Sequence, residues 1–228
     1  IAESKDVDMV TFTGSTEVGQ SIMRAAAGNV KKIGLELGGK SPNVIFADAD
    51  LDGAVEWAMI GIFLNQGEVC SAGSRIIIEE SIKDEFVKRL AKKANAITIG
   101  DPMENPDMGP LVSEDMTIVR EEIFGPVVTI QTFKTEQEAI DMANDTEYGL
   151  AGAVFTADGS RALRVIKEIR AGITWINCYN PAFNEAPWGG YKKSGIGRDL
   201  GVQGLEEYQE IKQININLNP GIVGWYEH

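Results

Sequence analysis

The sequence predicts an α/β protein built around a largely parallel sheet. Short runs rich in β-branched residues alternate with segments of helical periodicity, an order typical of strand–helix–strand units. The composition, 43% hydrophobic and 24% charged, is that of an ordinary globular protein. A length of 228 residues suits one large domain or two modest ones.

The first predicted unit lies near the amino end. Residues 9–14 form a β-rich run that stops at Gly14, and residues 15–28 then follow a helical pattern. A glycine turn before a polar helix start exposes backbone N–H groups that can bind a phosphate, although many such turns are only connections. A strand over 42–50 comes next, and Asp50 is placed to cap the helix after it.

The alternation continues to the end of the chain. Strands are predicted over 74–80, 124–133, 149–156 and 173–180, with helices from about Ser81, over 135–145 and over 159–172. The stretch 211–218 alternates apolar and polar residues and predicts a late strand with no helix after it. Such a strand must pair somewhere, and another subunit can supply the partner.

Charge and composition exclude several classes of partner. A net charge of −13 argues against nucleic acids and anionic membranes, because both require basic patches. No apolar run approaches the ~18 residues of a membrane span, and no signal-peptide pattern opens the sequence. Cys70 and Cys178 lie too far apart to form a CxxC motif. We therefore expect a cytoplasmic protein.

The histidine content limits the chemistry. The chain contains one histidine, His228, its last residue. Nucleophiles activated by an imidazole, and most zinc sites, are therefore close to excluded. Acid–base work falls to Glu, Asp, Lys or Tyr.

Cys70 and Glu36 are the candidate reactive residues. Cys70 lies in "NQGEVCSAG", where small neighbours leave room and backbone N–H groups around the sulfur, as attack on a carbonyl requires. The alternative is an inert buried thiol. Glu36 precedes a glycine pair between two leucines, and desolvation there would raise its pKa into the range of a general base. A plain surface carboxylate is the alternative, and Cys178 is interpreted as strand packing.

Six segments together resemble a known family. "FTGSTEVG", "LELGGKSPN", "NQGEVCSAGSR", "EEIFGP", "YGLAGAVFT" and "PWGGYKKSGIGRDLG" are similar, in order, to signature segments of the NAD(P)-dependent aldehyde dehydrogenase superfamily. The last segment with its preceding "AFNEA" is most similar to betaine aldehyde dehydrogenases. The resemblance implies that family's parallel-sheet catalytic domain, a Rossmann-like cofactor domain and a carboxyl-terminal oligomerisation strand.

The resemblance also implies roles for individual residues. Cys70 matches the nucleophile, which forms a thiohemiacetal, gives up a hydride to the nicotinamide and becomes a thioester. Glu36 matches the base that activates the thiol and the deacylating water. The matched cofactor-binding positions are Gly14, Ser15, Val18, Leu37, Glu122 and Phe124, with Glu122 as the carboxylate that holds the nicotinamide ribose.

Other positions match a substrate pocket, a subunit interface and a cation site of the family. Trp188 matches an aromatic residue of the substrate pocket, and Arg198 an interface residue with Glu210 as its partner. Backbone positions of a monovalent cation site, K⁺ in some betaine aldehyde dehydrogenases, match Val30, Lys192 and Gly195.

Two positions depart from the pattern. Asp199 stands where the family usually has a Glu that takes part in a proton relay. The side chain of Asp is one methylene shorter than that of Glu. Ile173 stands at a pocket-supporting position, where bulk in plant relatives disfavours betaine aldehyde. An aminoaldehyde or semialdehyde is therefore the alternative substrate.

The resemblance further implies missing chain. Family members carry a long region, including an oxyanion-hole Asn, before the position of Ile1, and a few dozen residues near 114–116. The expected division is a remnant of the cofactor domain over 1–38, the catalytic domain over 39–205, and an oligomerisation strand and tail over 206–228.

The parent is thus expected to be an aldehyde dehydrogenase using NAD, or NADP, and forming a homo-oligomer, a dimer or tetramer, whereas the isolated 228-residue chain is expected to be inactive. The expected substrate of the parent is a small aldehyde such as betaine aldehyde. The two rival interpretations are a cofactor-free cysteine acyl-transfer enzyme and a non-catalytic fragment. Binding of NAD would distinguish an aldehyde dehydrogenase from both rivals.

Overall fold

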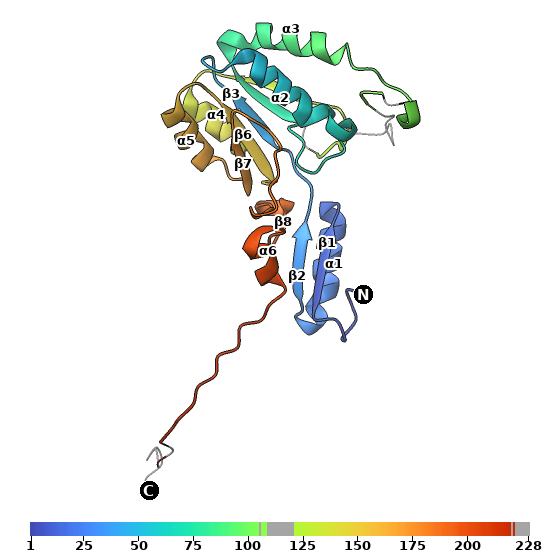
Figure 1. Ribbon diagram of the computed structural model, residues 1–228, viewed down its shortest axis with the longest axis vertical. Coiled ribbons are helices and arrows are strands. Elements are labelled where there is room, and N and C mark those ends of the chain that lie inside the picture. Colours follow the sequence, from blue (N-terminus) through green and yellow to red (C-terminus); the bar gives the residue numbers. More distant parts are fainter. Residues whose placement is uncertain (105, 109–120, 220, 222–228) are drawn as a thin grey trace.

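The computed structural model describes residues 1–104, 106–108, 121–219 and 221, and these residues form two parts and a tail (Figure 1). The larger part contains a five-stranded sheet between helices. The smaller part contains a three-stranded sheet, with the amino end of the chain beside it. This arrangement confirms the predicted α/β class.

The larger sheet is parallel throughout. Its strands are β3 (Pro42–Ile45), β4 (Arg75–Glu79), β5 (Thr129–Phe133), β6 (Ala151–Phe155) and β7 (Ile173–Ile176). They lie in the order β5-β4-β3-β6-β7, and every neighbouring pair is parallel. In this order β4 and β5 lie on one side of β3, and β6 and β7 lie on the other. The helices that connect the strands on the two sides therefore lie on opposite faces of the sheet.

Helices cover both faces of this sheet. The helix α2 (Leu51–Phe63) and α3 (Lys83–Ala94) cover one face, while α4 (Glu136–Asn144) and α5 (Gly159–Glu168) cover the other (Figure 1). Alternate residues of the strands point to the two faces. Ile45 accordingly packs in a core cluster with α2 and α3, whereas Val44 packs in a second cluster with α4 and α5.

The smaller sheet joins distant segments of the chain. It consists of β1 (Met9–Thr13), β2 (Lys32–Glu36) and β8 (Gly195–Ile196), in the order β1-β2-β8. β1 and β2 are parallel, with α1 (Thr16–Ala26) between them in sequence, and β8 is antiparallel to β2. The helix α6 (Gly201–Glu207) follows β8, and five 3₁₀ turns complete the assignment: η1 (Ala27–Asn29), η2 (Leu64–Gly67), η3 (Glu80–Ile82), η4 (Pro102–Glu104) and η5 (Lys192–Ser194).

The two sheets present opposite ends to each other. The segment after β2 continues directly into β3, so the carboxyl ends of β1 and β2 face the amino ends of the larger sheet (Figure 1). Loops that precede β3, β4 and β5 therefore meet the loop that follows β1. This junction holds the candidate site described below.

Three predicted strands are too long. Strand β3 ends at Ile45 instead of continuing to residue 50. Strand β5 begins at Thr129, and Phe124 before it has a φ of 53°, which a strand cannot contain. Strand β7 ends at Ile176, because Asn177 and Asn180 both have positive φ. Cys178 therefore lies in the loop after β7, although it still packs against the core as predicted.

The tail is not a strand within this chain. Residues 211–218 extend away from the body and pair with none of the described residues (Figure 1). Ile211, Ile214, Ile216 and Leu218 have exposed fractions of 100%, 74%, 75% and 84%. The predicted strand thus has no hydrogen-bonded partner strand among the described residues, and its apolar side chains face solvent.

The position of the expected internal gap, 114–116, lies outside the described residues. Among the helices that the structure describes, none combines the length and the apolar character needed to cross a membrane.

Candidate active site

A cleft of about 760 Å³ lies where the two parts meet. Its walls come from the end of β1, the end of β2, the loop before β4 and the loop before β5. The lining residues are Thr13, Gly14, Ser15, Glu36, Gly38, Glu68, Val69, Cys70, Glu121, Glu122, Ile123 and Phe124. Six predicted site residues, Gly14, Ser15, Glu36, Cys70, Glu122 and Phe124, therefore share one cavity.

Two adjacent glycines allow three segments to meet in this cleft. A Cβ atom on Gly38 would lie 1.8 Å from Oε2 of Glu122, and one on Gly39 would lie 2.6 Å from the carbonyl oxygen of Cys70. Any side chain at either position would displace the cleft wall. The glycine pair of "LELGGK" is thus required by close approach of other groups rather than by a turn.

Glu36 ends strand β2 and lies in the wall of two cavities. It pairs with Gly195 of β8 and lines both the main cleft and a smaller cavity of about 190 Å³. The residue is 9% exposed, and its Oε2 has no hydrogen-bond partner among the described residues. Burial, reinforced by the nearby Asp199 carboxylate and opposed by Arg198, raises the pKa of Glu36 to about 8. A carboxylate with this pKa can accept a proton near neutral pH.

Cys70 is a free, partly buried thiol at the opposite wall. Burial raises the pKa of the Cys70 thiol, and the Glu122 and Glu36 carboxylates add to this effect against backbone N–H groups that oppose it. The resting sulfur is therefore a thiol that needs a base. Tyr179, which is fully buried, donates a hydrogen bond to the carbonyl oxygen of Ser71 at 2.6 Å and so fixes the loop that carries Cys70.

The remaining wall suits an anionic, hydroxyl-bearing ligand. Ser15 caps α1 by accepting a hydrogen bond from the N–H of Val18 at 3.3 Å, so the amino end of α1 points into the cleft. Glu122 accepts a hydrogen bond from the N–H of Gly39 at 3.2 Å. Burial raises the pKa of Glu122, while that N–H group and Lys40 favour the carboxylate.

Two of the predicted cofactor residues do not line the cleft. Val18 lies one turn along α1 and is 46% exposed. Leu37 is buried, and its side chain packs over Gly19 of α1. Its backbone N–H donates to the carbonyl oxygen of Ser194 at 2.9 Å.

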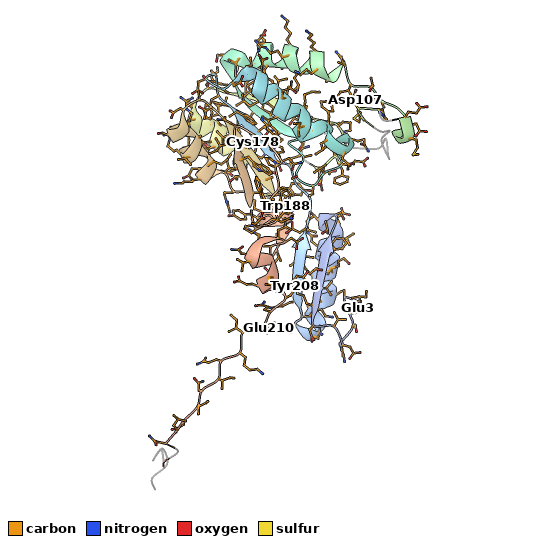
Figure 2. All side chains as sticks on the ribbon, viewed as in Figure 1. Glu3, Asp107, Cys178, Trp188, Tyr208 and Glu210 are labelled. Atoms are coloured by element: carbon orange, nitrogen blue, oxygen red, sulfur yellow. The ribbon has the colours of Figure 1, made fainter. Side chains whose placement is uncertain are left out.

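Trp188 and Asp199 form a two-residue bridge beside the site. Each backbone N–H donates to the other residue's carbonyl oxygen at 2.7 Å. Trp188 packs against Trp175, with ring centroids 6.4 Å apart, at the junction of the two parts (Figure 2). It is not among the lining residues of the cleft, whereas Asp199 lines the smaller cavity with Glu36. Ile173, the first residue of β7, packs against the core cluster beneath.

The structure does not bring the three predicted cation positions together within one chain. Gly195 lies opposite Glu36, at one end of β2, and Val30 precedes the other end. At ~3.3 Å per residue this separation is on the order of 20 Å. Nor does the predicted Arg198–Glu210 pair form within the chain: Glu210 binds Nζ of Lys32 at 3.1 Å, and Arg198 donates to the carbonyl oxygen of Gly197 at 2.6 Å.

Comparison with known proteins identifies the family. The model of the aldehyde dehydrogenase family matches residues 1–115 and 112–214. The chain belongs to the aldehyde dehydrogenase family. Among curated aldehyde dehydrogenases it is 44% identical to betaine aldehyde dehydrogenase of Bacillus subtilis over 275 aligned residues, which cover 99% of this chain and 56% of that protein. It is also 44% identical to the peroxisomal aminoaldehyde dehydrogenase 2 of Pisum sativum, covering 100% of this chain and 54% of the relative.

Solved aldehyde dehydrogenase structures agree with the fold. The crystal structure of betaine aldehyde dehydrogenase from Staphylococcus aureus in complex with NAD⁺ superposes with a TM-score of 0.95 at 43% identity, covering 100% of this chain and 55% of that one. The chain therefore spans about half the length of the aldehyde dehydrogenases it matches.

Sequence reasoning missed the residues that brace this aldehyde dehydrogenase site. Buried Arg75 donates to the carbonyl oxygens of Lys40, Met142 and Ala143 at 2.7–2.8 Å. Lys192 donates to the carbonyl oxygens of Asn144 and Thr146 at 3.1 and 3.0 Å. Both cations thus bind the carboxyl end of α4, where helix carbonyls lack partners. A buried strand that opens with arginine was the available signal.

Proposed function

We propose that this chain supplies the nucleophile, the general base and part of the cofactor wall of an NAD-dependent aldehyde dehydrogenase that oxidises a small aldehyde to the acid. The single observation that carries the proposal is the shared cleft of Cys70, Glu36 and Glu122. A cofactor-free acyl-transfer enzyme would use the first two residues but leaves Glu122 and the capped end of α1 without a role.

The residues of the cleft fit a dinucleotide. The amino end of α1, with Ser15, would hold a phosphate, and Glu122 would accept hydrogen bonds from ribose hydroxyls. Phe124, 46% exposed at the rim, offers an aromatic face. When bound, NAD supplies the hydride acceptor that the oxidation requires. NAD is preferred over NADP because the similar Staphylococcus aureus enzyme is described in complex with NAD⁺.

The chain's own residues then carry the protons of the reaction. Cys70 loses its proton to Glu36 and its sulfur attacks the aldehyde carbon, giving a covalent adduct. After oxidation the acyl group is held as a thioester on Cys70, and Glu36 releases to solvent the proton that it took from the thiol. Glu36 then takes a proton from water as the water attacks this thioester, and it returns this proton to the sulfur as the acid leaves, so the thiol is restored.

The substrate proposed is a cationic aldehyde. The net charge of −13 favours approach of a cation, and the similar relatives are named for betaine aldehyde and aminoaldehydes. Trp188 at the junction would supply an aromatic face, an interaction worth ~0.5–2 kcal/mol for an ammonium group. Its contact with Trp175 favours the alternative of plain packing. Trp188→Ala should raise KM for betaine aldehyde more than for a neutral aldehyde of similar size; equal increases would assign Trp188 to packing.

Association of subunits through the tail is a further part of the proposal. The exposed isoleucines of 211–218 and the unpaired backbone there suit addition to a sheet edge of another copy. We also propose a domain division at residues 38 and 205. We further propose that relatives carry an additional internal segment near 114–116. Support for that segment comes from the 275-residue alignment of a 228-residue chain and from the two family matches that meet at 112–115.

Binding of NAD tests the proposed function directly. Titration of the 228-residue chain with NAD should give saturable binding that Glu122→Gln weakens about tenfold, since a charged acceptor of hydrogen bonds is lost. Glu3→Gln, which changes an exposed carboxylate far from the cleft (Figure 2), is the matched control. Binding that is unaffected by Glu122→Gln would refute the assigned cofactor wall.

A further inference from the structure

Ser194 is a buried side chain near the cleft whose hydroxyl both donates and accepts a hydrogen bond. It is 0% exposed and lies at the end of η5, in the segment between Trp188 and Asp199. Its hydroxyl donates to the carbonyl oxygen of Gly38 at 2.6 Å and accepts from the N–H of Gly149 at 3.0 Å. Its own carbonyl oxygen accepts from the N–H of Leu37 at 2.9 Å.

The peptide group between Gly38 and Gly39 is held at both ends. Its carbonyl oxygen accepts the hydrogen bond from Ser194, and its N–H donates to Oε1 of Glu122 at 3.2 Å. Hydrogen bonds in such a chain polarise one another, so the bond at the oxygen strengthens the bond at the N–H. Oε2 of the same carboxylate packs directly against Gly38, where an added Cβ atom would lie 1.8 Å from it.

We propose that Ser194 is a positioning residue that sets the orientation of Glu122, and with it the cofactor wall, through the Gly38–Gly39 peptide. The same bonds fix the backbone directly after Glu36, because Leu37 is tied to Ser194 as well. Ser194 touches neither the cleft nor a ligand, since it is not among the lining residues. The expected effect of Ser194 on NAD binding rests on the proposed function. The hydrogen bonds that hold the Gly38–Gly39 peptide do not depend on that function.

The side chain of Ser194 packs closely against Gly190. A Cβ atom on Gly190 would lie 2.4 Å from Cβ of Ser194, so residue 190 has room for glycine alone. Alanine keeps the Cβ but removes the hydroxyl, and cysteine keeps the shape with a weaker donor. The neighbouring Lys193 offers a control, because its side chain is at the surface and pairs with Glu147 without reaching Gly38.

The first measurement concerns the peptide alone. Amide hydrogen exchange of Gly39, followed by NMR on the 228-residue chain without NAD, should accelerate about tenfold or more in Ser194→Ala, as expected for loss of a ~1.4 kcal/mol constraint. Ser194→Cys should lie between Ser194→Ala and wild type, and Lys193→Ala should match wild type. Unchanged exchange at Gly39 in folded Ser194→Ala would overturn the inference.

The second measurement is a double-mutant cycle on NAD affinity. Ser194→Ala should weaken NAD binding about tenfold in the wild-type background and have no further effect in a Glu122→Gln background. Equal weakening in both backgrounds means that Ser194 acts only on general stability, and overturns the inference. A wild-type chain that does not bind NAD refutes the proposed function instead, and Gly39 exchange then decides the role of Ser194.

Discussion

Glu36 pairs with Gly195 across the antiparallel ladder of β2 and β8, and this pairing holds the carboxylate between the two cavities. A Cβ atom on Gly195 would lie 1.9 Å from the carbonyl oxygen of Leu35. Glu36, the proposed base, is therefore positioned by a segment about 160 residues later in the chain. Four predictions follow from this arrangement and its neighbours.

The stability of the chain should fall as the pH rises from about 4.5 to about 8. In this window folded Glu36, with a pKa of about 8, keeps a proton that the unfolded chain, with a value near 4.5, has released. The slope reaches at most ~1.4 kcal/mol per pH unit for one proton. Glu36→Gln should remove this slope and be more stable than wild type at pH 8, as measured by urea unfolding. A slope that persists in the variant would show that the proton belongs to another group.

Alkylation of Cys70 should respond to the charge of Glu122. Because that carboxylate raises the pKa of the Cys70 thiol, Glu122→Gln should lower it and increase the thiolate fraction at pH 8. A decrease of half a pKa unit corresponds to a roughly threefold faster reaction with iodoacetamide. Mass-mapped labelling measures both cysteines, so Cys178 serves as the internal control. Burial alone raises the pKa of Cys178, so the charge of Glu122 should not affect its labelling. Equal acceleration at both cysteines would instead indicate partial unfolding.

Gly38 should not tolerate a methyl group. Gly38→Ala would place Cβ 1.8 Å from Oε2 of Glu122, so the carboxylate must move out of the cleft wall. We expect NAD affinity to fall at least tenfold, measured by calorimetric titration. Gly28→Ala is the matched control, because a Cβ there meets nothing within 4 Å. If Gly38→Ala bound NAD with wild-type affinity, the assignment of Glu122 to the cofactor wall would be wrong.

Arg75 should contribute strongly to stability. Arg75 is 6% exposed and its guanidinium bonds three carbonyl oxygens. Arg75→Met would leave those of Lys40 and Ala143 without this donor, whereas that of Met142 still accepts from the N–H of Asp145. At ~1–3 kcal/mol for each buried group left unsatisfied, we expect a loss of at least ~2 kcal/mol in urea unfolding. Arg89→Met removes surface ion pairs with Asp52 and Glu85, and its effect should be far smaller. Similar losses in both variants would contradict the bracing role of Arg75.

The sequence predicted the site better than its supports. Cys70, Glu36 and Glu122 were all chosen from their motifs, and although they lie on separate segments, all three line one cleft. Ser194 and Arg75 escaped notice because their roles depend on backbone carbonyls, which carry no signature in the sequence. Strand β2 was missed because two of its five residues, Gly34 and Lys32, weaken its apolar pattern. The tail was expected to be a strand, but a strand requires a partner that alternation cannot supply.

The site lies at the amino edge of the five-stranded sheet, whereas the helices leave from the carboxyl edge. Every loop that carries a reactive group therefore runs directly into a buried parallel strand. One residue inserted before Pro42 or Arg75 would either shift the register of that strand, turning its side chains to the wrong face, or push Cys70 from Gly39. Length changes should accordingly be rejected in 37–41 and 68–74. The edge of the sheet that carries the site is therefore an edge whose connections have a fixed length.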